Sequence, residues 1–450
     1  MILLVERWDD NARRLAYSLA AAEYEVQTVV IQYDGFCDDE VVSPYEFFIY
    51  GGSIPQERSP LYFDKLELSD YWELQSTNSG GEIYDYEQLR AKLFYAEPKD
   101  RRYIRIIDWM DKEGRVCCSD HYNRFGHRFA QTVLNNQQKT VHKTYYHPDG
   151  TEALTENLLT GDIILTEDGK NVFFHSKSDF VIYYLLCAGL NVDRILYNSL
   201  SVPFFVAGKY CSQVNHLAHN VLFWQEPIAE EIPGNMRSIL ENNTAGTDVI
   251  AVQRKDAFEK IRTFDVDQKR FYSLGFIYPE LRENTAGSDA LIFTNSDQIE
   301  KLNELVQELP EIHFHIGAIT EMSPKLLQMT AYSNVSLYPT ITEKQIEALW
   351  KKCDLYLDIN LGSEILSSVE TAFKNKALIF AFENTAHNRY FVAEKNLFRP
   401  ESYQNMAAAL RHAVAAQRGM EDELKIQWNA ANAASPQDYR RVIDGELDFE

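Results

Sequence analysis

The chain has little positive charge for its size. Its 44 lysines and arginines stand against 67 aspartates and glutamates, a formal net charge of −23 over 450 residues. Such a chain repels phosphate backbones and anionic headgroups, which disfavours nucleic acid or a membrane surface as its main partner. Long apolar runs are also missing, because the longest, near 180–190, is too short to span a bilayer. With no signal peptide visible, we expect a cytoplasmic protein.

Sequence motifs for metals and common cofactors are missing as well. The six cysteines are scattered, with no Cys-x-x-Cys pair and no His/Cys cluster at zinc spacing. We therefore expect reduced thiols and no metal site. The chain has no G-x-G-x-x-G after its first expected strand, and no P-loop, G-x-S-x-G or H-E-x-x-H. We therefore do not expect NAD, and we expect no other cofactor.

What the sequence does contain is an α/β rhythm interrupted by a β-rich segment. A strand over 2–5, a helix over about 9–22 with Asp9 as N-cap, and a strand over 27–31 begin a βαβ unit. From about 61 to 175, β-rich runs alternate with turns such as Glu113-Gly114 and Asp149-Gly150, which predict hairpins. We therefore expect a Rossmann-like domain formed by 1–60 and 176–280, with an antiparallel β-meander domain, 61–175, inserted in it.

A second Rossmann-like domain is expected over 289–425, after a linker at 279–289. Residues 426–450 are expected to form a C-terminal helix, a candidate to return to the first domain, and an acidic tail. The fold class is therefore α/β, with two Rossmann-like domains facing a cleft and a β-meander domain inserted in the first.

The most informative stretch is 353–387. It predicts a strand over 355–359, a loop with Gly362, a helix over about 363–374, a strand over 377–382 and another loop. Ligands of parallel sheets bind beyond the carboxyl ends of the strands. This arrangement resembles GT-B-type glycosyltransferases, which hold the donor nucleotide-sugar at this element with two glutamates. Glu370 matches the second glutamate, whereas Gly362 stands eight positions earlier, where the first is expected.

The loop after the first strand of the second domain also departs from that pattern. Active relatives carry an Arg and a Lys there, whereas Thr294–Lys301 is acidic and its lysine is expected inside a helix. Diphosphate near Asp297 would be disfavoured by like charge. The resemblance therefore implies the architecture of a glycosyltransferase, and the residues indicate a non-catalytic one with no catalytic residue of its own.

Polar and aromatic side chains near expected strand ends are candidates for a groove that binds an extended Ser/Thr-rich peptide. The candidates are Trp224, Glu226, Asn360, Glu364, Glu370 and His387. A Trp ring is a good platform for sugar or peptide, and a buried Trp224 explains the pattern equally well. Ordinary structural roles exist for the others too. Asn360 would cap a helix, Glu364 would be favoured by the helix dipole, and Glu370 and His387 would be solvated polar residues.

Three groups of sequence strings, taken together in their order, resemble the GtfB family. They are Val30–Phe36 with Ser43–Tyr45, Phe223–Glu226 with Ile232–Met236, and Cys353–Gly362 with Ala381–His387. This family comprises the glycosylation chaperone subunits of the accessory Sec system in Gram-positive bacteria. The resemblance implies a complex with GtfA, a catalytic O-GlcNAc transferase of the same fold. In that complex the chain would stabilise GtfA and bind a serine-rich repeat adhesin for cytosolic glycosylation before export.

The resemblance also implies that the meander takes part in subunit association, and that the complex has a peripheral association with the inner face of the cell membrane. Two alternatives stay open. The chain would be an active retaining transferase that uses UDP-GlcNAc, or a purely structural partner that only protects GtfA.

Overall fold

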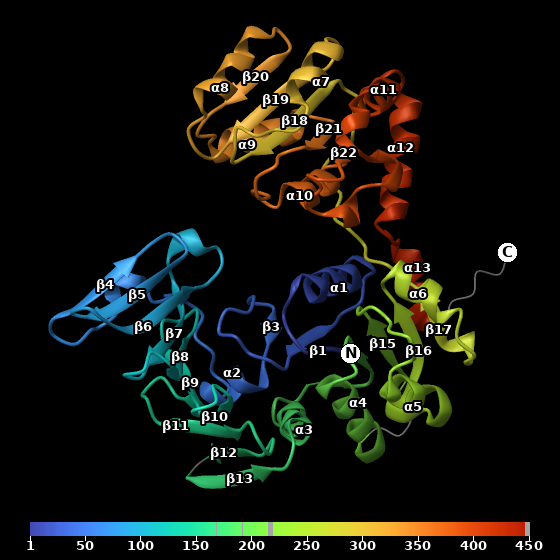
Figure 1. The fold of residues 1–450 in the computed structure, drawn as a ribbon. Coiled ribbons are helices and arrows are strands. Elements are labelled where there is room, and N and C mark those ends of the chain that lie inside the picture. Colours follow the sequence, from blue (N-terminus) through green and yellow to red (C-terminus); the bar gives the residue numbers. More distant parts are fainter. Residues whose placement is uncertain (168, 191, 215–218, 446–450) are drawn as a thin grey trace. The chain divides into compact units, whose positions relative to one another are not determined.

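Three sheets organise the chain in the computed structural model, which describes residues 1–167, 169–190, 192–214 and 219–445 (Figure 1). The chain divides into two units. Unit 1 comprises Met1–Ser273 and the C-terminal segment from Tyr439, and unit 2 comprises Leu274–Asp438. Each unit has its own parallel sheet, and unit 1 also contains an antiparallel sheet.

The parallel sheet of unit 1 has the order β17-β16-β15-β14-β1-β2-β3. Its strands are β1 (Ile2–Val5), β2 (Gln27–Val30), β3 (Val41–Val42), β14 (Ile195–Tyr197), β15 (Asn220–Trp224), β16 (Thr247–Val252) and β17 (Phe271–Ser273). Its helices are α1 (Asp10–Ala21), α2 (Pro44–Ile49), α3 (Lys177–Cys187), α4 (Val202–Gln213), α5 (Gly234–Asn242) and α6 (Lys255–Ile261). As predicted, Asp9 caps α1 by accepting a hydrogen bond from Ala12 N at 2.9 Å.

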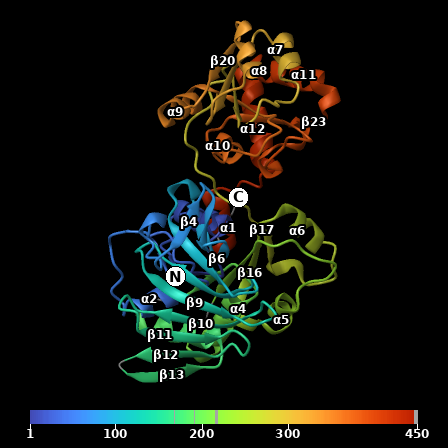
Figure 2. The same cartoon turned by 60° about the vertical axis from the view of Figure 1, so that its left-hand side comes forward.

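The antiparallel sheet is a ten-stranded meander in which each strand pairs with the next along the chain (Figure 2). Its strands are β4 (Trp72–Ser76), β5 (Gly80–Asp85), β6 (Gln88–Tyr95), β7 (Ile104–Met110), β8 (Val116–Tyr122), β9 (Arg128–Leu134), β10 (Thr140–Tyr146), β11 (Glu152–Asn157), β12 (Ile163–Glu167) and β13 (Lys170–Phe174). Antiparallel pairing of strands that are neighbours along the chain produces this order, as the turn signals predicted.

A buried polar cluster joins the meander to the parallel sheet of unit 1. We call Tyr33, Glu46 and Arg124 the meander junction. The Arg124 guanidinium lies 3.1 Å from the Glu46 carboxylate, and both side chains are buried. Tyr33 donates a hydrogen bond to the same carboxylate at 2.8 Å. Because a buried charge needs a partner, this cluster fixes the meander against α2.

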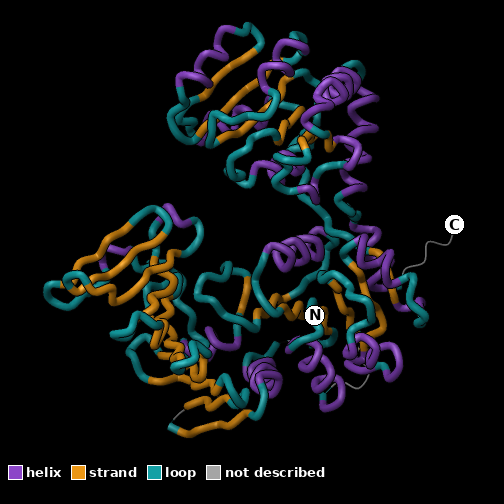
Figure 3. Tube along the Cα trace, viewed as in Figure 1, coloured by secondary structure: helices purple, strands orange, loops and turns teal. Residues whose placement is uncertain are grey.

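The parallel sheet of unit 2 has the order β20-β19-β18-β21-β22-β23, and helices flank its strands (Figure 3). The strands are β18 (Asp289–Thr294), β19 (His313–Ala318), β20 (Val335–Tyr338), β21 (Leu355–Asp358), β22 (Leu378–Phe382) and β23 (Leu397–Phe398). The helices are α7 (Leu302–Glu308), α8 (Pro324–Leu327), α9 (Glu343–Lys352), α10 (Ser368–Lys374), α11 (Tyr403–Val414) and α12 (Gln417–Ala430). One buried apolar cluster from strands and helices forms the core.

These sheets confirm the predicted fold class of two α/β domains with an inserted β-meander. One helix prediction was wrong. The helix expected from about 363 starts only at Ser368, because Leu366 and Ser367 have φ of 58° and 45°. An L-residue in this left-handed region interrupts an α-helix.

The C-terminal region differs from the expected single helix and tail. Residues 426–430 end α12, and a separate helix, α13 (Pro436–Asp444), follows. Its second half belongs to unit 1, where Tyr439 stacks on Phe223 with ring centroids 6.3 Å apart. The tail residues 446–450 lie outside the described residues. Across the described ranges, none of the helices combines the length and apolar character needed to cross a membrane.

Candidate functional site

The candidate site of unit 2 lies in the loops that follow β21 and β22. Asp358 ends β21, and His387 lies in the loop after β22. The backbone N–H of His387 donates to Asp358 Oδ2 at 2.8 Å, and its Nδ1 lies 2.5 Å from Oδ1. On the other side of the ring, Nε2 lies 2.6 Å from the carbonyl oxygen of Gly362. We call Asp358, Asn360, Gly362 and His387 the β21–β22 loop network.

His387 is a cation in this network. The Gly362 carbonyl only accepts hydrogen bonds, so Nε2 must carry a proton, and the carboxylate of Asp358 favours a second proton on Nδ1. The hydrogen bond to Asp358, together with the one to Gly362, raises the pKa of His387 to about 9. Both ring nitrogens are therefore engaged within the protein at neutral pH, and His387 links the two loops.

Asn360 is buried, and both its amide oxygen and its amide nitrogen form hydrogen bonds within the protein. Its Oδ1 accepts hydrogen bonds from Thr294 Oγ1 at 2.8 Å and from Gly362 N at 3.1 Å. Its Nδ2 donates to the Ser363 carbonyl at 3.2 Å and to Asn295 Oδ1 at 3.3 Å. Asn360 therefore acts as a loop brace between β18 and β21, rather than as the helix cap that the sequence offered as its ordinary role.

Gly362 packs too closely against its neighbour to be replaced by a larger residue without a shift. A Cβ atom at this position would lie 2.0 Å from Asn295 Oδ1 and 3.3 Å from Asn360 Nδ2. Real Cβ atoms essentially never come as close as the first of these distances, so Asn295 would have to move. A glutamate at this position, where the resemblance expects the first one, would therefore require the exposed Asn295 side chain to turn away.

The two glutamates near α10 have partners close by in the chain. Glu364 Oε1 accepts a hydrogen bond from Val369 N at 2.9 Å, which satisfies an N–H group at the start of the helix. Glu370 Oε1 lies 2.9 Å from Lys374 Nζ, one turn further along α10. Glu364 thus has the helix-start role that the sequence gave as its ordinary alternative.

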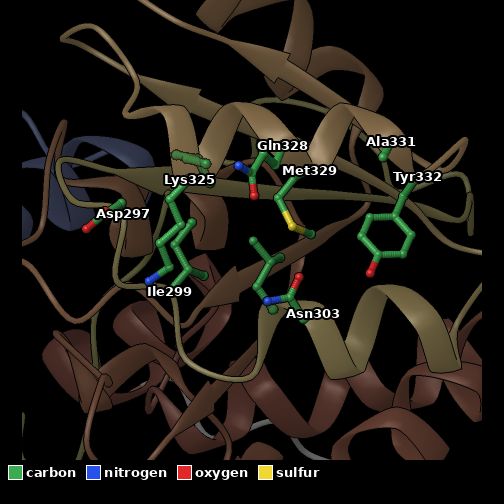
Figure 4. Close-up of a pocket in the computed structure, with 10 residues that line it drawn as sticks. Asp297, Ile299, Asn303, Lys325, Gln328, Met329, Ala331 and Tyr332 are labelled. Atoms are coloured by element: carbon green, nitrogen blue, oxygen red, sulfur yellow. The ribbon is translucent and has the colours of Figure 1, made fainter.

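A pocket of about 410 Å³ lies beside this network, between the loop leading into α7 and the segment formed by α8 and a 3₁₀ turn, Gln328–Ala331 (Figure 4). Figure 4 shows Lys325 and Met329 extending towards the loop and helix that carry Ile299 and Asn303. Asp297 lies at the same pocket and accepts a hydrogen bond from Ser323 Oγ at 3.2 Å.

The pocket adds a cation that the sequence reasoning missed. Lys325 lines it, whereas Lys301 pairs with Glu304 at 3.3 Å and lies over the Tyr403 ring. Lys325 comes from a helix of four residues after a Ser-Pro step, and this pattern carries no ligand signal. Lys325 lies near Asp297 only because β18 and β19, which precede the two residues in the chain, pair side by side in the sheet.

The remaining two candidates belong to unit 1. Trp224 ends β15 and is only 3% exposed, and its Nε1 has no hydrogen-bond partner among the described residues. Its ring is therefore part of the core, and the structure does not offer it as a surface platform. Glu226 is exposed in the loop that follows. Within the described part of the chain, no three His, Cys, Asp or Glu side chains gather in a way that would hold a metal ion.

By class, two parallel α/β sheets with an inserted meander define a GT-B-like fold. Four family models match the chain in order. They are the GtfB N-terminal domain over 2–48, the GtfB middle domain over 72–175, the GtfB third domain over 177–264 and the GftB/GlyA-F C-terminal domain over 290–427.

Relatives that match most of this chain share one name. The chain is 42% identical over 399 residues to the UDP-N-acetylglucosamine--peptide N-acetylglucosaminyltransferase stabilizing protein GtfB of Streptococcus agalactiae, covering 88% of this chain and 89% of that protein. It is 38% identical over 450 residues to the protein of the same name from Streptococcus gordonii, covering 99% of each. The chain therefore belongs to the GtfB family.

Solved structures agree with this assignment. A chain of the crystal structure of the GtfA/B complex bound to UDP and GlcNAc matches with a TM-score of 0.89 and 38% identity, over 99% of this chain and 100% of that one. The pneumococcal O-GlcNAc transferase GtfA in complex with UDP and GlcNAc matches with a TM-score of 0.53 and 13% identity, over 99% of each chain. The second match shows the shared fold alone.

Proposed function

We propose that this protein is the non-catalytic subunit of a peptide O-GlcNAc transferase. It binds a GtfA-type enzyme, stabilises it, and binds the serine-rich repeat adhesin polypeptide that the complex glycosylates. Membership of the GtfB family supports the stabilising role, because its relatives are named for stabilising this transferase. The complex would work in the cytoplasm, with peripheral contact to the inner face of the membrane, before export of the adhesin.

One observation carries the non-catalytic part of this proposal: the position expected for the first glutamate is Gly362, which has no side chain and packs against Asn295 Oδ1. A transferase needs groups that are free to meet charge that develops on the donor. In the β21–β22 loop network, the polar atoms of His387 and Asn360 already form hydrogen bonds with neighbouring residues of the chain. Glu364 and Glu370 are engaged next to α10. Catalysis by the partner enzyme fits this arrangement better than catalysis by this chain.

The second candidate function is an active retaining transferase that uses UDP-GlcNAc. The pocket of about 410 Å³ favours it, since Lys325 lies there beside the end of β18. Calorimetric titration of the purified chain with UDP-GlcNAc decides between the two. Binding near micromolar strength, about −8 kcal/mol, with turnover that is lost in Glu370→Ala, would favour the enzyme. If the chain neither binds UDP-GlcNAc nor turns it over, the non-catalytic stabilising subunit is the function that agrees with the result.

The stabilising role is tested by mixing this chain with a purified GtfA-type transferase. We expect the mixture to keep the activity of the enzyme on a serine-rich peptide during incubation at raised temperature, whereas the enzyme alone loses it. We expect this chain alone to transfer no sugar. Equal rates of inactivation with and without the chain would contradict the stabilising role.

The meander offers a surface for this partner. Tyr71 precedes β4 and Tyr86 begins the β5–β6 turn, and they lie at the same end of the sheet because Trp72 pairs with Asp85. Their exposed fractions are 82% and 79%. Exposed aromatic side chains are frequent anchors of interfaces. We expect the double substitution Tyr71→Ser, Tyr86→Ser to weaken association at least about tenfold.

A matched control lies in the turn between β11 and β12. Leu159 is 68% exposed, so Leu159→Ser removes a similar exposed apolar group elsewhere on the meander. We expect it to leave the affinity for the transferase unchanged. Equal affinities for the double variant and the control, measured by sedimentation, would place the interface elsewhere. Retained glycosylation after changes at Glu226 or Glu370 would favour the purely structural partner over the peptide-binding subunit.

A further inference from the structure

A second pocket, of about 500 Å³, lies in unit 1, where the meander meets the parallel sheet. Its floor on one side is formed by the loops after β1 and β2, at the carboxyl ends of these strands. In parallel sheets this edge is where ligands bind. Strands β7, β8, β10 and β11 of the meander close the other side. Neither the β21–β22 loop network nor the pocket of unit 2 includes any of these residues.

Each carboxylate at this pocket already has a partner. Glu156 lies 2.7 Å from Lys177 Nζ and also accepts a hydrogen bond from Tyr45 at 3.3 Å. Asp34 accepts from Phe36 N at 2.9 Å, and Asp9 caps α1. The acidic groups of the pocket are therefore already engaged within the chain.

Two cations of the same pocket have no such partner. Among the described residues, neither Lys143 nor Arg105 forms an ion pair or a hydrogen bond through its side chain. Lys143 Nζ lies over the Tyr145 ring, 4.9 Å from its centroid, and 5.9 Å from that of Phe129. Burial lowers the pKa of Lys143 to about 8. An ammonium in this setting is costly, and a cation–π contact replaces only part of its hydration.

The pKa of His121 is lowered by burial and by the charges of both Lys143 and Arg105, so both cations act on the same wall of the pocket. Burial, together with these two charges, lowers the pKa of His121 to about 3. His121 is thus neutral, with Nε2 bonded to Thr132 Oγ1 at 2.9 Å. The local field at this wall of the pocket is positive, although the whole chain carries a net charge of −23.

We propose that this pocket binds an anionic group, a carboxylate or a phosphate, between Lys143 and Arg105. The carboxylates of Glu156 and Asp34 act on Lys143 only from a distance. A carboxylate or phosphate oxygen in the pocket would accept direct hydrogen bonds from both Lys143 and Arg105. The aromatic rings around Lys143, among them Tyr145, give the body of the ligand an apolar wall. The group comes either from a small free anion or from an acidic side chain of a bound polypeptide.

Titration calorimetry of the full chain, at constant ionic strength and without phosphate buffer, tests this site with three probes. They are sodium pyrophosphate, a serine-rich peptide with one glutamate, and the same peptide with glutamine in its place. Binding of pyrophosphate identifies a free anion as the source. Binding of the glutamate peptide, but not of the glutamine peptide, identifies an acidic side chain.

Two variants tie the binding to the pocket. We expect Lys143→Met and Arg105→Gln each to reduce the affinity of the bound probe at least about tenfold, the loss of one charge-assisted hydrogen bond. Lys92→Met, on an exposed position of the same sheet, is the control and should leave the affinity unchanged. We expect Lys143→Met to keep or raise the melting temperature, because it removes a buried ammonium and keeps the aliphatic stem.

The outcomes separate a binding site from a structural role. If no probe binds the wild-type chain, or if the affinity survives both substitutions, the proposal is overturned. A Lys143→Met chain that fails to fold would show that the ammonium stabilises the fold, and Arg105→Gln would then decide alone. This test is independent of the proposed function, because it uses no transferase and no glycosylation readout.

Discussion

His387 ties the loop after β22 to the loop after β21 through both of its ring nitrogens. Its pKa is raised to about 9, whereas an unfolded histidine titrates near 6.5. The proton therefore binds more tightly in the folded state. Its contribution to stability is fully present below about pH 6.5 and is lost as the pH rises through about 9.

We expect the melting temperature of wild-type protein to fall between about pH 6.5 and 9 relative to that of His387→Gln. At pH 6 the substitution should cost about 1–3 kcal/mol, the penalty for leaving the buried Asp358 carboxylate without its charged partner. Calorimetry of both chains across this range measures the difference. Parallel curves would mean that the histidine does not gain a proton on folding.

Gly362 lies in the same network, and its close packing against Asn295 can be tested by substitution. Gly362→Glu should destabilise unit 2 by about 0.5–1.5 kcal/mol, because the new Cβ overlaps Asn295 Oδ1, and this exposed side chain must give up its hydrogen bond with Asn360 to turn away. It should not create transferase activity, since a single carboxylate does not free the other groups of the network. Removing the obstacle in the pair Gly362→Glu, Asn295→Gly should recover part of the lost stability. Urea unfolding measures both, and an unchanged stability in the single variant would contradict the packing explanation.

The spacing of Gly362 and Glu370 was visible in the sequence, and so was the acidic loop at 294–301. The contacts that explain them were not. Nothing in the local pattern indicates that Asn295 fills the space at Gly362, because the two lie 67 positions apart in the chain. The same holds for Lys325, which reaches the pocket only through the order of β18 and β19.

Among the larger elements, the meander is fixed to the parallel sheet of unit 1 by the meander junction. Arg124→Met would leave the buried Glu46 carboxylate with Tyr33 as its hydrogen-bond donor but without its counter-charge. We expect a loss of about 3–5 kcal/mol in the free energy of unfolding. Burial already raises the pKa of Glu46, so the loss should shrink at low pH, where the carboxyl group is protonated.

The matched control is the pair Arg124→Met, Glu46→Gln, which removes the charge on both sides. It should be more stable than Arg124→Met alone at neutral pH, because no unpaired charge stays buried. Chemical denaturation followed by circular dichroism compares the two. An equal loss in both would mean that shape, and not charge, holds the junction.

Elements with clear turn chemistry were predictable from the sequence, and elements ended by unusual backbone were not. The Asp-Gly and Glu-Gly turns marked the meander, and the Asp9 cap marked α1. The start of α10 was missed, because Leu366 and Ser367 adopt the left-handed conformation without a glycine or asparagine to signal it. Both side chains are exposed, and the sequence offers no signal for the local hydrogen bonds on either side of them, from Val369 N to Glu364 and from Thr371 Oγ1 to the Ser367 carbonyl.

At the scale of the whole molecule, the chain leaves unit 1 after Ser273 and returns to it at Tyr439. The amphipathic pattern of α13 predicts a packed face but does not say which sheet it covers. The structure places Tyr439, Val442 and Ile443 in the core of unit 1, all nearly inaccessible. Asp444 pairs with Arg194 at 3.2 Å and accepts a hydrogen bond from Tyr24 at 2.6 Å. The return of the chain therefore stabilises the unit that carries the N-terminus.

Tyr439→Ala should accordingly destabilise unit 1 by about 3–5 kcal/mol, because the ring stacks on Phe223 and its hydroxyl accepts a hydrogen bond from Gln253 at 3.3 Å. Unit 2 has its own core, so its unfolding should not change. Hydrogen exchange read by mass spectrometry separates the two units: peptides of β1 and β15 should exchange faster, and peptides of β18 and β21 should not. Faster exchange in both units would mean that they unfold together as one cooperative body.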